Sequence, residues 1–432
     1  MRSAALAFLV LVATVPAARA ALSPQERTMI ATVDAEYERS IALLQRLVDQ
    51  NSGTMNLAGV RAVADMVAPE FERLGFRVEW KPMERAGRAG HLIATHAGRP
   101  GGKRLLLIGH LDTVFEADSP FQKFVRDGDR GHGPGAADNK GGVVVVLAAL
   151  RAMQAAGTLA DADIEVVLTG DEEDAGSPQS ISRADLIAAG KRADVALDFE
   201  GLSTENGQDM GSIARRSVGD WTLTTRGRSG HSSGIFSKAA GDGAIFEMAR
   251  IIAAFRSELP EPNLTFNVGL LGGGQSAEVG ADGAHVAATG KSNIIPSIAV
   301  AKGDFRTLSP EQTQRVAAKM QQIVAAHLPG TDAELVFEEG YPPMAPTAGN
   351  RALLAKLNAV NADLGLAPMP ALDPLKRGAG DISFVAADVD GLVGLGPASS
   401  GDHTPRETVD LDSLRRQAKR AAILMSRLTA AP

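Results

Sequence analysis

The stretch "IEVVLTGDEEDAGS", residues 164–177, joins an apolar run directly to four consecutive carboxylates. An apolar run of this length, rich in β-branched residues and ended by Gly170, predicts a buried strand. Carboxylates that lie this close together repel one another, and removing them from water is costly. We therefore expect positive charge beside residues 171–174, unless these residues form only a solvated turn.

Similar apolar runs on both sides of this stretch alternate with segments of helical periodicity. Strand-like runs occupy residues 76–82, 91–98, 103–113, 194–200 and 390–396. Helical spacing of apolar residues occupies residues 26–49, 56–74, 142–156, 351–365 and 411–430. Continuous apolar strands alternating with helices are typical of a mostly parallel sheet that is buried on both faces. The sequence therefore predicts an α/β catalytic domain in which helices flank a mostly parallel mixed sheet.

From Ser217 the order of elements changes to βαββαβ, which is a ferredoxin-like unit complete in itself. Its predicted strands and helices, in chain order, are residues 221–227, 240–259, 264–273, 297–306, 309–328 and 333–339. We predict an inserted domain over residues 217–340. It would divide the catalytic domain into two segments, residues 21–216 and 341–432.

Residues 1–20 have the features of a secretory signal peptide. Arg2 precedes an apolar stretch, and the pattern Ala-Arg-Ala ends at Ala20, where we expect cleavage. The mature protein is then expected in the periplasm or outside the cell. No later segment is long and apolar enough to predict a membrane span.

Composition narrows the range of partners and cofactors. Loss of the two arginines in residues 1–20 changes the net charge from −7 to −9, and no basic stripe compensates it. This balance argues against a nucleic-acid or anionic-membrane partner. The chain has no cysteine, so a metal site would have to use histidine, aspartate and glutamate.

Several polar residues follow predicted strands, where the functional crevice of a parallel sheet forms. His110 and Asp112 are two positions apart, so the carboxylate can accept the Nδ1 hydrogen and leave Nε2 for a metal. Glu200 ends another strand. Asp138 precedes a helix, where its alternative role is that of an N-cap. His403 lies on a loop after the last strand, and each of these residues alone could be structural.

Taken together, these segments resemble a known family. They are "GHLDTVF" (109–115), "GPGAADNKGG" (133–142), "GDEEDAGS" (170–177), "DFEG" (198–201) and "GDHTPRE" (401–407). In this order they resemble the co-catalytic zinc exopeptidase family, which includes glutamate carboxypeptidase, succinyl-diaminopimelate desuccinylase and acetylornithine deacetylase. The resemblance spans roughly residues 30–425 and is greatest to the glutamate carboxypeptidase branch.

The resemblance implies a site with two zinc ions, for which Co²⁺ or Mn²⁺ are alternatives. It implies that His110 and Glu200 hold one ion, that Glu173 and His403 hold the other, and that Asp138 bridges both.

The resemblance also implies how the reaction proceeds. Asp112 would orient the first histidine, and Glu172 would be the general base that takes a proton from a metal-activated water. The implied activity is hydrolysis of a peptide or N-acyl amide bond next to a free carboxylate. N-acyl amino acid deacylase or dipeptidase activity of the same family is the alternative.

In the resembled family the inserted domain forms a homodimer. A histidine matching His231 reaches the partner's site to stabilise the oxyanion, and residues matching Asn293 and Arg306 hold substrate. The glycine-rich segment that begins at Gly378 is implied to bind substrate as well, although its sequence departs from the family pattern.

A further departure concerns positive charge. Members of the glutamate carboxypeptidase branch carry an additional arginine where this chain reads "FEEGYPPMAP", residues 337–346. Arg215 and Arg216 could supply the missing charge, and we expect at least one of them to be solvated.

Two other function classes are considered. Residues 230–234, "GHSSG", match the serine hydrolase pattern with Ser232 as nucleophile, but that pattern requires a sharp strand-to-helix elbow. A non-catalytic, metal-dependent solute-binding protein is the second, yet a binder would have no use for Glu172 beside Glu173. A metal-dependent hydrolase would be inhibited by a chelator but not by serine-directed reagents, whereas a serine hydrolase would show the opposite.

Overall fold

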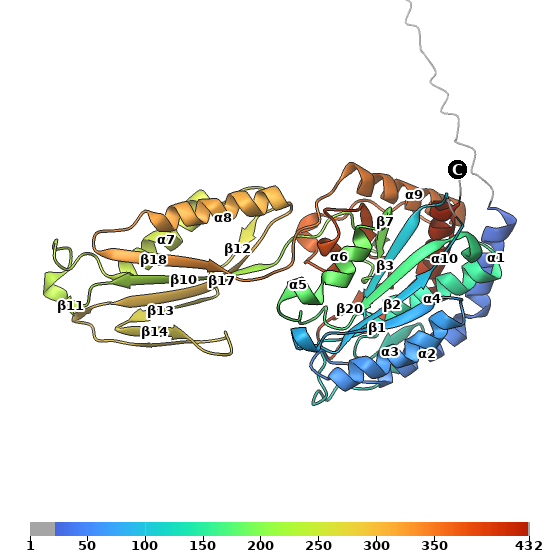
Figure 1. The fold of residues 1–432 in the computed structure, drawn as a ribbon, viewed down its shortest axis with the longest axis horizontal. Helices are drawn as coiled ribbons and strands as arrows, with labels where there is room; N and C mark the ends of the chain where they lie inside the picture. Colours follow the sequence, from blue (N-terminus) through green and yellow to red (C-terminus); the bar gives the residue numbers. More distant parts are fainter. Residues whose placement is uncertain (1–21, 100, 431–432) are drawn as a thin grey trace, which may run out of the picture.

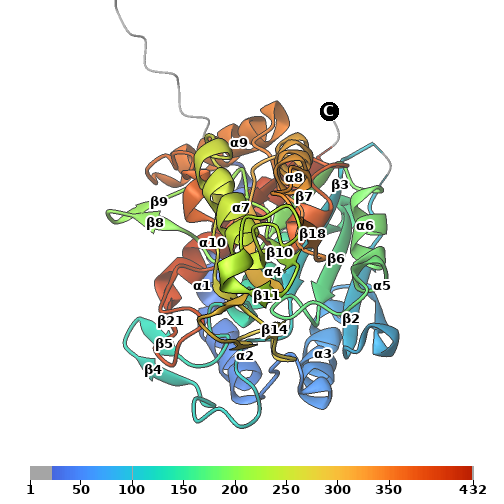
Figure 2. The same ribbon diagram turned by 90° about the vertical axis from the view of Figure 1, so that its left-hand side faces the viewer.

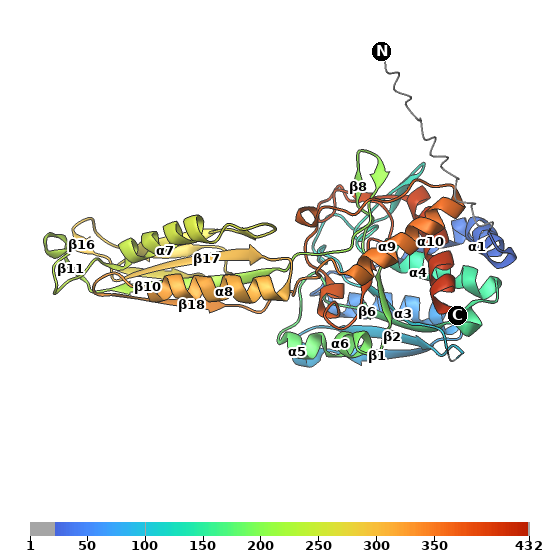
Figure 3. The same ribbon diagram turned by 90° about the horizontal axis from the view of Figure 1, so that it is seen from above.

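The computed structural model describes residues 22–99 and 101–430. It consists of two bodies joined by two chain segments, so that the smaller body projects from the larger one (Figure 1; Figure 3). The predicted signal peptide, residues 1–20, lies outside the described residues. Within the described part, no helix combines the length and apolar character needed to cross a membrane.

The larger body is built on a mixed sheet with the strand order β1-β2-β6-β3-β7-β19. These strands are β1 (Arg77–Pro82), β2 (Gly90–His96), β6 (Asp163–Thr169), β3 (Arg104–His110), β7 (Val195–Asp198) and β19 (Gly391–Val393). β3 pairs in parallel with β6 and β7, and β7 pairs in parallel with β19, whereas β1 and β2 form an antiparallel edge. The predicted fold class, a mostly parallel sheet flanked by helices, is confirmed.

Helices cover both faces of this sheet. They are α1 (Pro24–Ala35), α2 (Tyr37–Asp49), α3 (Leu57–Glu72), α4 (Lys140–Ala155), α5 (Gln179–Ser182), α6 (Ala184–Gly190), α9 (Ala348–Leu364) and α10 (Leu411–Thr429). Leu105 and Leu107 of β3 belong to the core shared with α1 to α4, α9 and α10, whereas Leu106 and Ile108 belong to the core under α6. Burial on both faces explains why the strand is apolar at every position.

The continuous helical pattern predicted over residues 26–49 is wrong in one respect. The structure breaks it at Glu36 into α1 and α2. Glu36 has φ −95° and ψ 11°, outside the helical range, and a single-residue bend of this kind barely disturbs apolar periodicity.

The larger body also contains short elements that the periodicity did not predict. They are β4 (Val125–Asp127), β5 (Arg130–His132), β20 (Ser399–Ser400), β21 (Thr408–Asp410), β8 (Thr204–Glu205), β9 (Gln208–Asp209), η1 (Glu84–Ala86), η2 (Leu159–Asp161), η4 (Pro374–Lys376) and η5 (Asp381–Phe384). Strands of two or three residues are too short to give a periodic signal in sequence.

The smaller body, called the insert below, has the element order predicted for a ferredoxin-like unit. Its main elements are β10 (Gly219–Gly227), α7 (Ala244–Glu258), β12 (Thr265–Phe266), β13 (Leu270–Gly274), β17 (Ile298–Arg306), α8 (Pro310–Ala325) and β18 (Thr331–Phe337). β17 pairs with β10 and with both β12 and β13, and β10 pairs with β18. Figure 2 shows α7 and α8 side by side on one face of this sheet, where Trp221 and Phe255 pack edge to face at 5.9 Å.

The insert also carries two small antiparallel pairs. These are β14 (Ser276–Val279) with β15 (Val286–Thr289), and β11 (Gly230–His231) with β16 (Ile294–Ile295). Figure 1 places β11 at the end of the insert that is remote from the larger body.

The two chain segments that join the bodies pair with each other. Arg215 forms an antiparallel bridge with Met344, and Val218 forms one with Tyr341. The main-chain hydrogen bonds of these bridges are 2.9–3.0 Å long. We call the two segments, residues 215–218 and 341–344, the hinge ladder.

Candidate metal centre

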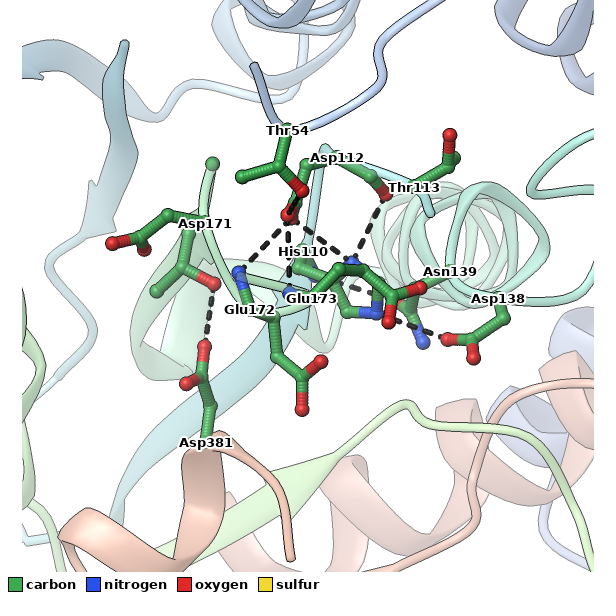
Figure 4. A network of polar contacts seen from close by, with 12 residues as sticks. Thr54, His110, Asp112, Thr113, Asp138, Asn139, Asp171, Glu172, Glu173 and Asp381 are labelled. Atoms are coloured by element: carbon green, nitrogen blue, oxygen red, sulfur yellow. Dashed lines mark hydrogen bonds and ion pairs between the residues drawn. The ribbon is translucent and has the colours of Figure 1, made fainter. Parts of the chain in front are cut away.

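The carboxyl ends of three neighbouring strands and two loops meet at one point of the larger body. Figure 4 shows the part of this point that is formed by His110, Asp138, Glu172 and Glu173. β3 ends at His110, β6 leads into Glu172 and Glu173, and β7 leads into Glu200. Parallel strands bring these ends to the same edge of the sheet. The loop before α4 adds Asp138, and the loop after β20 adds a histidine that is described next.

Asp138 lies at the centre of this cluster, between two histidines. Its Oδ1 is 3.0 Å from Nε2 of His110, and its Oδ2 is 3.1 Å from Nε2 of His403. Two further carboxylates complete the arrangement. Glu200 Oε1 is 3.3 Å from Nε2 of His110, and Glu173 Oε2 is 3.3 Å from Nε2 of His403. One carboxylate therefore faces two equivalent histidine–glutamate pairs.

This donor set fits a pair of small divalent cations. Ligands bound at about 2.0–2.2 Å in a tetrahedral shell lie about 3.3 Å from one another, close to the separations found here. Glu173 Oε1 is buried and has no hydrogen-bond partner, so a buried donor atom remains free. Imidazole and carboxylate donors without thiolate suit zinc and similar ions. The structure brings all five residues of the implied ligand set together.

The cluster carries more negative charge than its buried surroundings tolerate. Burial raises the pKa of Glu172 well above its usual value, and the charge of Glu200 raises it further. Burial and then the charge of Asp138 raise the pKa of Glu173 to about 11. Carboxyl groups in this state favour either protons or bound cations. The charge balance thus agrees with the geometry of the donor set.

Asp112 has a role beyond orienting a histidine. Its Oδ1 is 3.3 Å from Nδ1 of His110, which leaves Nε2 to face the cluster. The same carboxylate accepts main-chain hydrogen bonds from Glu172 and Glu173, each 3.1 Å long, and a hydroxyl hydrogen bond from Thr54 at 2.7 Å. One buried carboxylate therefore fixes both the first histidine and the turn that carries the two glutamates.

The alternative role of Asp138 as an N-cap is wrong. Asn139 occupies the N-cap position of α4, and its side chain makes no capping hydrogen bond. The carboxylate of Asp138 points instead toward the two histidines.

The acidic stretch after β6 separates into three environments. Asp171 is buried and pairs with Arg183 at 2.6 Å, whereas Asp174 is more exposed and pairs with Arg88 at 2.8 Å. The two glutamates between them face the cluster (Figure 4). The expected positive charge is therefore supplied partly by protein arginines, and the rest remains for bound cations.

Tyr341 of the hinge ladder touches the same turn. Its hydroxyl donates a 2.8 Å hydrogen bond to the main-chain carbonyl of Glu172 and accepts one of 2.7 Å from Arg183. Its ring packs against Phe384 at 4.8 Å. The segment that returns from the insert thus holds the main chain of Glu172.

Replacing Tyr341 with Phe is expected to lower kcat about 10-fold, with KM changed less than about twofold, because the Glu172 carbonyl loses its donor. Steady-state kinetics and metal analysis of the purified variant would check this. The chain's other tyrosine offers a control, since Tyr37→Phe lies on α2, outside the site. An unchanged kcat in Tyr341→Phe would contradict the positioning role.

The residues implied to bind substrate fall into two groups. His231 and Asn293 are exposed and adjacent at the far end of the insert, where the main-chain N–H of Ser232 donates to the Asn293 carbonyl at 2.9 Å. Within one chain they do not join the metal cluster (Figure 1). Arg306 lies at the opposite end of β17, and its Nη1 is 3.7 Å from the position that a Cβ on Gly378 would occupy.

Ser232 does not occupy a nucleophile elbow. It follows the two-residue strand β11 and begins a single 3-10 turn, η3 (Ser232–Gly234), while α7 begins only at Ala244. The sharp strand-to-helix turn that the serine hydrolase pattern needs is missing at this position.

The expectation that Arg215 or Arg216 is solvated is wrong, since their exposed fractions are only 5% and 9%. Arg215 Nη1 lies 3.5 Å from Glu200 Oε2, and Arg216 Nη1 donates to Thr265 Oγ1 at 2.6 Å. The reason is that both residues belong to the start of the hinge ladder, which packs between the two bodies.

Sequence reasoning missed several residues that support the site, among them Thr54, Arg183, Tyr341 and Arg377. None belongs to a recognisable motif, and each acts through contacts with residues far away in sequence. Only Arg377 carried a usable signal, because it directly precedes the glycine-rich segment 378–383.

A comparison with protein families decides the classification. The model of peptidase family M20/M25/M40 matches residues 106–427, which includes every residue of the cluster. The chain belongs to peptidase family M20/M25/M40. As a member of this family it is a metal-dependent hydrolase of the metallopeptidase and amidohydrolase class, and the predicted resemblance is confirmed.

Individual M20 relatives are similar over nearly the whole chain. Carboxypeptidase G2 of Pseudomonas sp. (strain RS-16) is 26% identical over 404 residues, covering 91% of this chain and 90% of the relative. Succinyl-diaminopimelate desuccinylase of Azoarcus sp. (strain BH72) is 27% identical over 397 residues, covering 88% of this chain and 95% of the relative. A dinuclear metal-binding M20 peptidase of Bacillus subtilis has the same fold, with a TM-score of 0.64 and 16% identity. The match covers 92% of this chain and 100% of that peptidase.

Proposed function

We propose that the protein is a dinuclear metallo-exopeptidase that cleaves a peptide or N-acyl amide bond next to a free carboxylate. Two zinc ions would be held by five residues, namely His110, Glu200, Glu173, His403 and the bridging Asp138. The observation that carries the proposal is the placement of one carboxylate between two histidine–glutamate pairs at 3.0–3.3 Å. Co²⁺ or Mn²⁺ are the alternative ions.

When bound, two such ions polarise the scissile carbonyl and lower the pKa of a water molecule. The protein's own contribution begins with Glu172, whose main chain is fixed by Asp112 and Tyr341. Its buried carboxylate, with a pKa raised by burial and by Glu200, is suited to accept a proton from water and pass it to the leaving amine.

Charge also orients the substrate along the crevice. Arg215 lies 3.5 Å from Glu200 of the cluster, whereas Arg306 lies on β17 of the insert and pairs with Asp304 at 3.2 Å. A substrate carboxylate would be attracted by Arg306, because an arginine can bind a carboxylate in a bidentate manner. This attraction favours an amide whose leaving amine carries a carboxylate, as in a carboxypeptidase or an N-acyl amino acid deacylase.

A substrate panel tests the proposal. Dipeptides, N-acetyl amino acids and the same compounds with the carboxylate amidated would be incubated with the zinc-loaded protein, and release of the amine would be measured. We expect turnover only of compounds with the free carboxylate. Equal turnover of the amidated compounds would argue against it, and no turnover of any compound would favour a metal-dependent binding protein.

We also propose a homodimer formed through the insert. Support comes from exposed apolar side chains on α7, β13 and the loop before α7, namely Phe236, Phe246 and Leu271, with the two phenylalanine rings 5.5 Å apart. A partner would cover this surface. His231 is remote from the metal cluster of its own chain. In the dimer it would lie close to the metal cluster of the partner subunit, where it could donate a hydrogen bond to the oxyanion.

Replacing Phe246 with Asp is expected to convert the dimer to a monomer, because a charge would be buried in an apolar interface. Light scattering after size-exclusion chromatography measures the mass. Val336→Asp is a matched control, since Val336 is similarly exposed but lies on β18, the opposite edge of the sheet. A dimeric Phe246→Asp protein, or a monomeric wild type, would contradict the proposal.

Export is part of the same proposal and rests on the pattern of residues 1–20. A mature protein that begins at Ala21 and is recovered from the periplasmic or extracellular fraction would support it. Full-length protein in the cytoplasmic fraction would not.

A further inference from the structure

Glu407 is a buried glutamate that no step of the proposed reaction uses, and its exposed fraction is only 1%. Its Oε1 accepts main-chain hydrogen bonds from Ala137 at 3.0 Å and from Asp138 at 3.2 Å, and its Oε2 accepts one of 3.2 Å from Gly135. Three N–H groups of one loop thus converge on a single carboxylate. We call residues 133–138, which end in the bridging aspartate, the bridging loop.

The main chain of Glu407 closes the loop that carries His403. Its N–H donates a 3.0 Å hydrogen bond to the Thr404 carbonyl, and its carbonyl accepts one of 3.4 Å from Gly133 of the bridging loop. Immediately beyond these contacts, β21 pairs antiparallel with β5. We call residues 401–407 the histidine loop. A single residue therefore joins two loops, each of which carries a ligand of the metal cluster.

Both loops contain backbone that has to be held in place. His403 has φ 60°, in the left-handed region that non-glycine residues rarely adopt, and its side chain is 55% exposed. Gly135 has φ 71°, and a Cβ at this position would lie 2.5 Å from Cγ2 of Thr113. Backbone in a rarely populated region persists only where the surrounding contacts hold it. A side chain that is half exposed has few packing contacts, so the hydrogen bonds of the histidine loop must hold His403.

The arrangement around Glu407 is similar to that around Asp112. Asp112 contacts His110 and accepts a main-chain hydrogen bond from Glu173 (Figure 4). Glu407 belongs to the histidine loop and accepts main-chain hydrogen bonds from the bridging loop. Each carboxylate joins two segments that carry metal ligands, but the two carboxylates join different pairs of segments.

We propose that Glu407 is a positioning residue that holds Asp138 and His403 at the separation that a metal ion between them requires. The inference rests on the proposed function, in which Glu173, His403 and the bridging aspartate hold one ion, called here the His403 ion. The other ion, called the His110 ion, has separate support from the buried aspartate beside that histidine. Loss of Glu407 should therefore weaken binding of the His403 ion more than binding of the His110 ion.

The variants Glu407→Gln and Glu407→Leu separate hydrogen bonding from packing. Glutamine keeps one acceptor oxygen, whereas leucine fills a similar volume and keeps none. We expect zinc affinity for the His403 ion to fall about 10-fold with glutamine and about 100-fold with leucine, while affinity for the His110 ion changes less than about threefold. Calorimetric titration of the metal-free protein with Zn²⁺ measures both affinities. Anomalous X-ray scattering at limiting zinc shows which position is emptied.

Amide hydrogen exchange tests the same inference without metal or turnover. In the metal-free protein, the N–H groups of the bridging loop should exchange at least about 10-fold faster in Glu407→Leu than in wild type, because three of them lose their acceptor. Exchange in the turn of residues 171–173 should stay the same, since Asp112 holds that turn.

Glu247→Gln is the matched control. Glu247 is also a buried glutamate that accepts a main-chain hydrogen bond, from Leu328 at 2.9 Å, but it lies on α7 of the insert. Its substitution should leave both zinc affinities unchanged. Circular dichroism would show that each variant is folded, and Glu407→Gln alone decides the question if Glu407→Leu does not fold.

Three results would overturn the inference alone, provided that wild type binds two ions. They are unchanged zinc affinities in the Glu407 variants, equal weakening of both ions, and tighter zinc binding with leucine than with glutamine. Wild-type protein that binds fewer than two ions would refute the dinuclear site and this inference together. Wild-type protein that binds two ions but hydrolyses no substrate would refute only the proposed activity, because the zinc titrations would still decide the role of Glu407.

Discussion

Replacing Glu172 with Gln is expected to lower kcat by about 10²–10⁴-fold while metal content stays the same. The side chain keeps its size, so the packing of the turn and its hydrogen bonds to Asp112 and Tyr341 should survive. The amide cannot accept the proton of the attacking water. Steady-state kinetics together with elemental analysis of bound metal would measure both quantities.

The neighbouring acid Asp174 provides the control for this substitution. It lies two residues away in the same acidic stretch, but it is exposed and pairs with Arg88 outside the cluster. Asp174→Asn should therefore retain nearly full kcat. If Glu172→Gln kept more than about a tenth of wild-type turnover, general-base catalysis by this residue would be rejected.

Replacing Asp138 with Asn is expected to remove both metal ions and with them the activity. Asp138 is the only described carboxylate within 3.1 Å of the Nε2 atoms of both His110 and His403. A neutral amide offers one weak oxygen donor in place of two anionic ones, so it cannot bridge two cations. Metal stoichiometry after dialysis, measured beside activity, checks the result.

Chelation of the wild-type protein should mimic this substitution reversibly. Activity should disappear after dialysis against a chelator and return when Zn²⁺ is added. Ser232→Ala serves as the comparison, because it removes the only hydroxyl nucleophile that the serine hydrolase reading would use. Activity that survives chelation, or that is lost in Ser232→Ala while metal remains bound, would reverse the assignment.

Much of the fold follows from local patterns that can be read along the chain. The runs around Leu105 and Val166 are apolar at every position because both faces of their strands are buried. Since parallel strands place their carboxyl ends at one edge, the sequence alone predicts that His110 and Glu200 meet. The break at Glu36 shows the limit of this reasoning, because one non-helical residue leaves the apolar spacing nearly unchanged.

The supporting contacts of the site could not be read in this way. Asp112 was expected to orient a histidine, but its hydrogen bonds to the main chain of Glu172 and Glu173 depend on how two loops approach each other. Tyr341 contacts the turn of residues 171–173 although it lies more than 150 residues further along the chain. Arg183 contacts the same turn from about ten residues away. No periodicity or motif encodes such contacts.

The amino-acid sequence by itself determined the order of the elements and the chemical identity of the donors at the strand ends. These depend on short-range patterning and on which side chains can bind a cation. The tertiary structure alone decided how charge is balanced, pairing Asp171 with Arg183, burying Arg216 and leaving Arg377 without a carboxylate partner among the described residues. The physical reason is that electrostatic pairing depends on distance in space and on burial, neither of which is encoded by spacing along the chain.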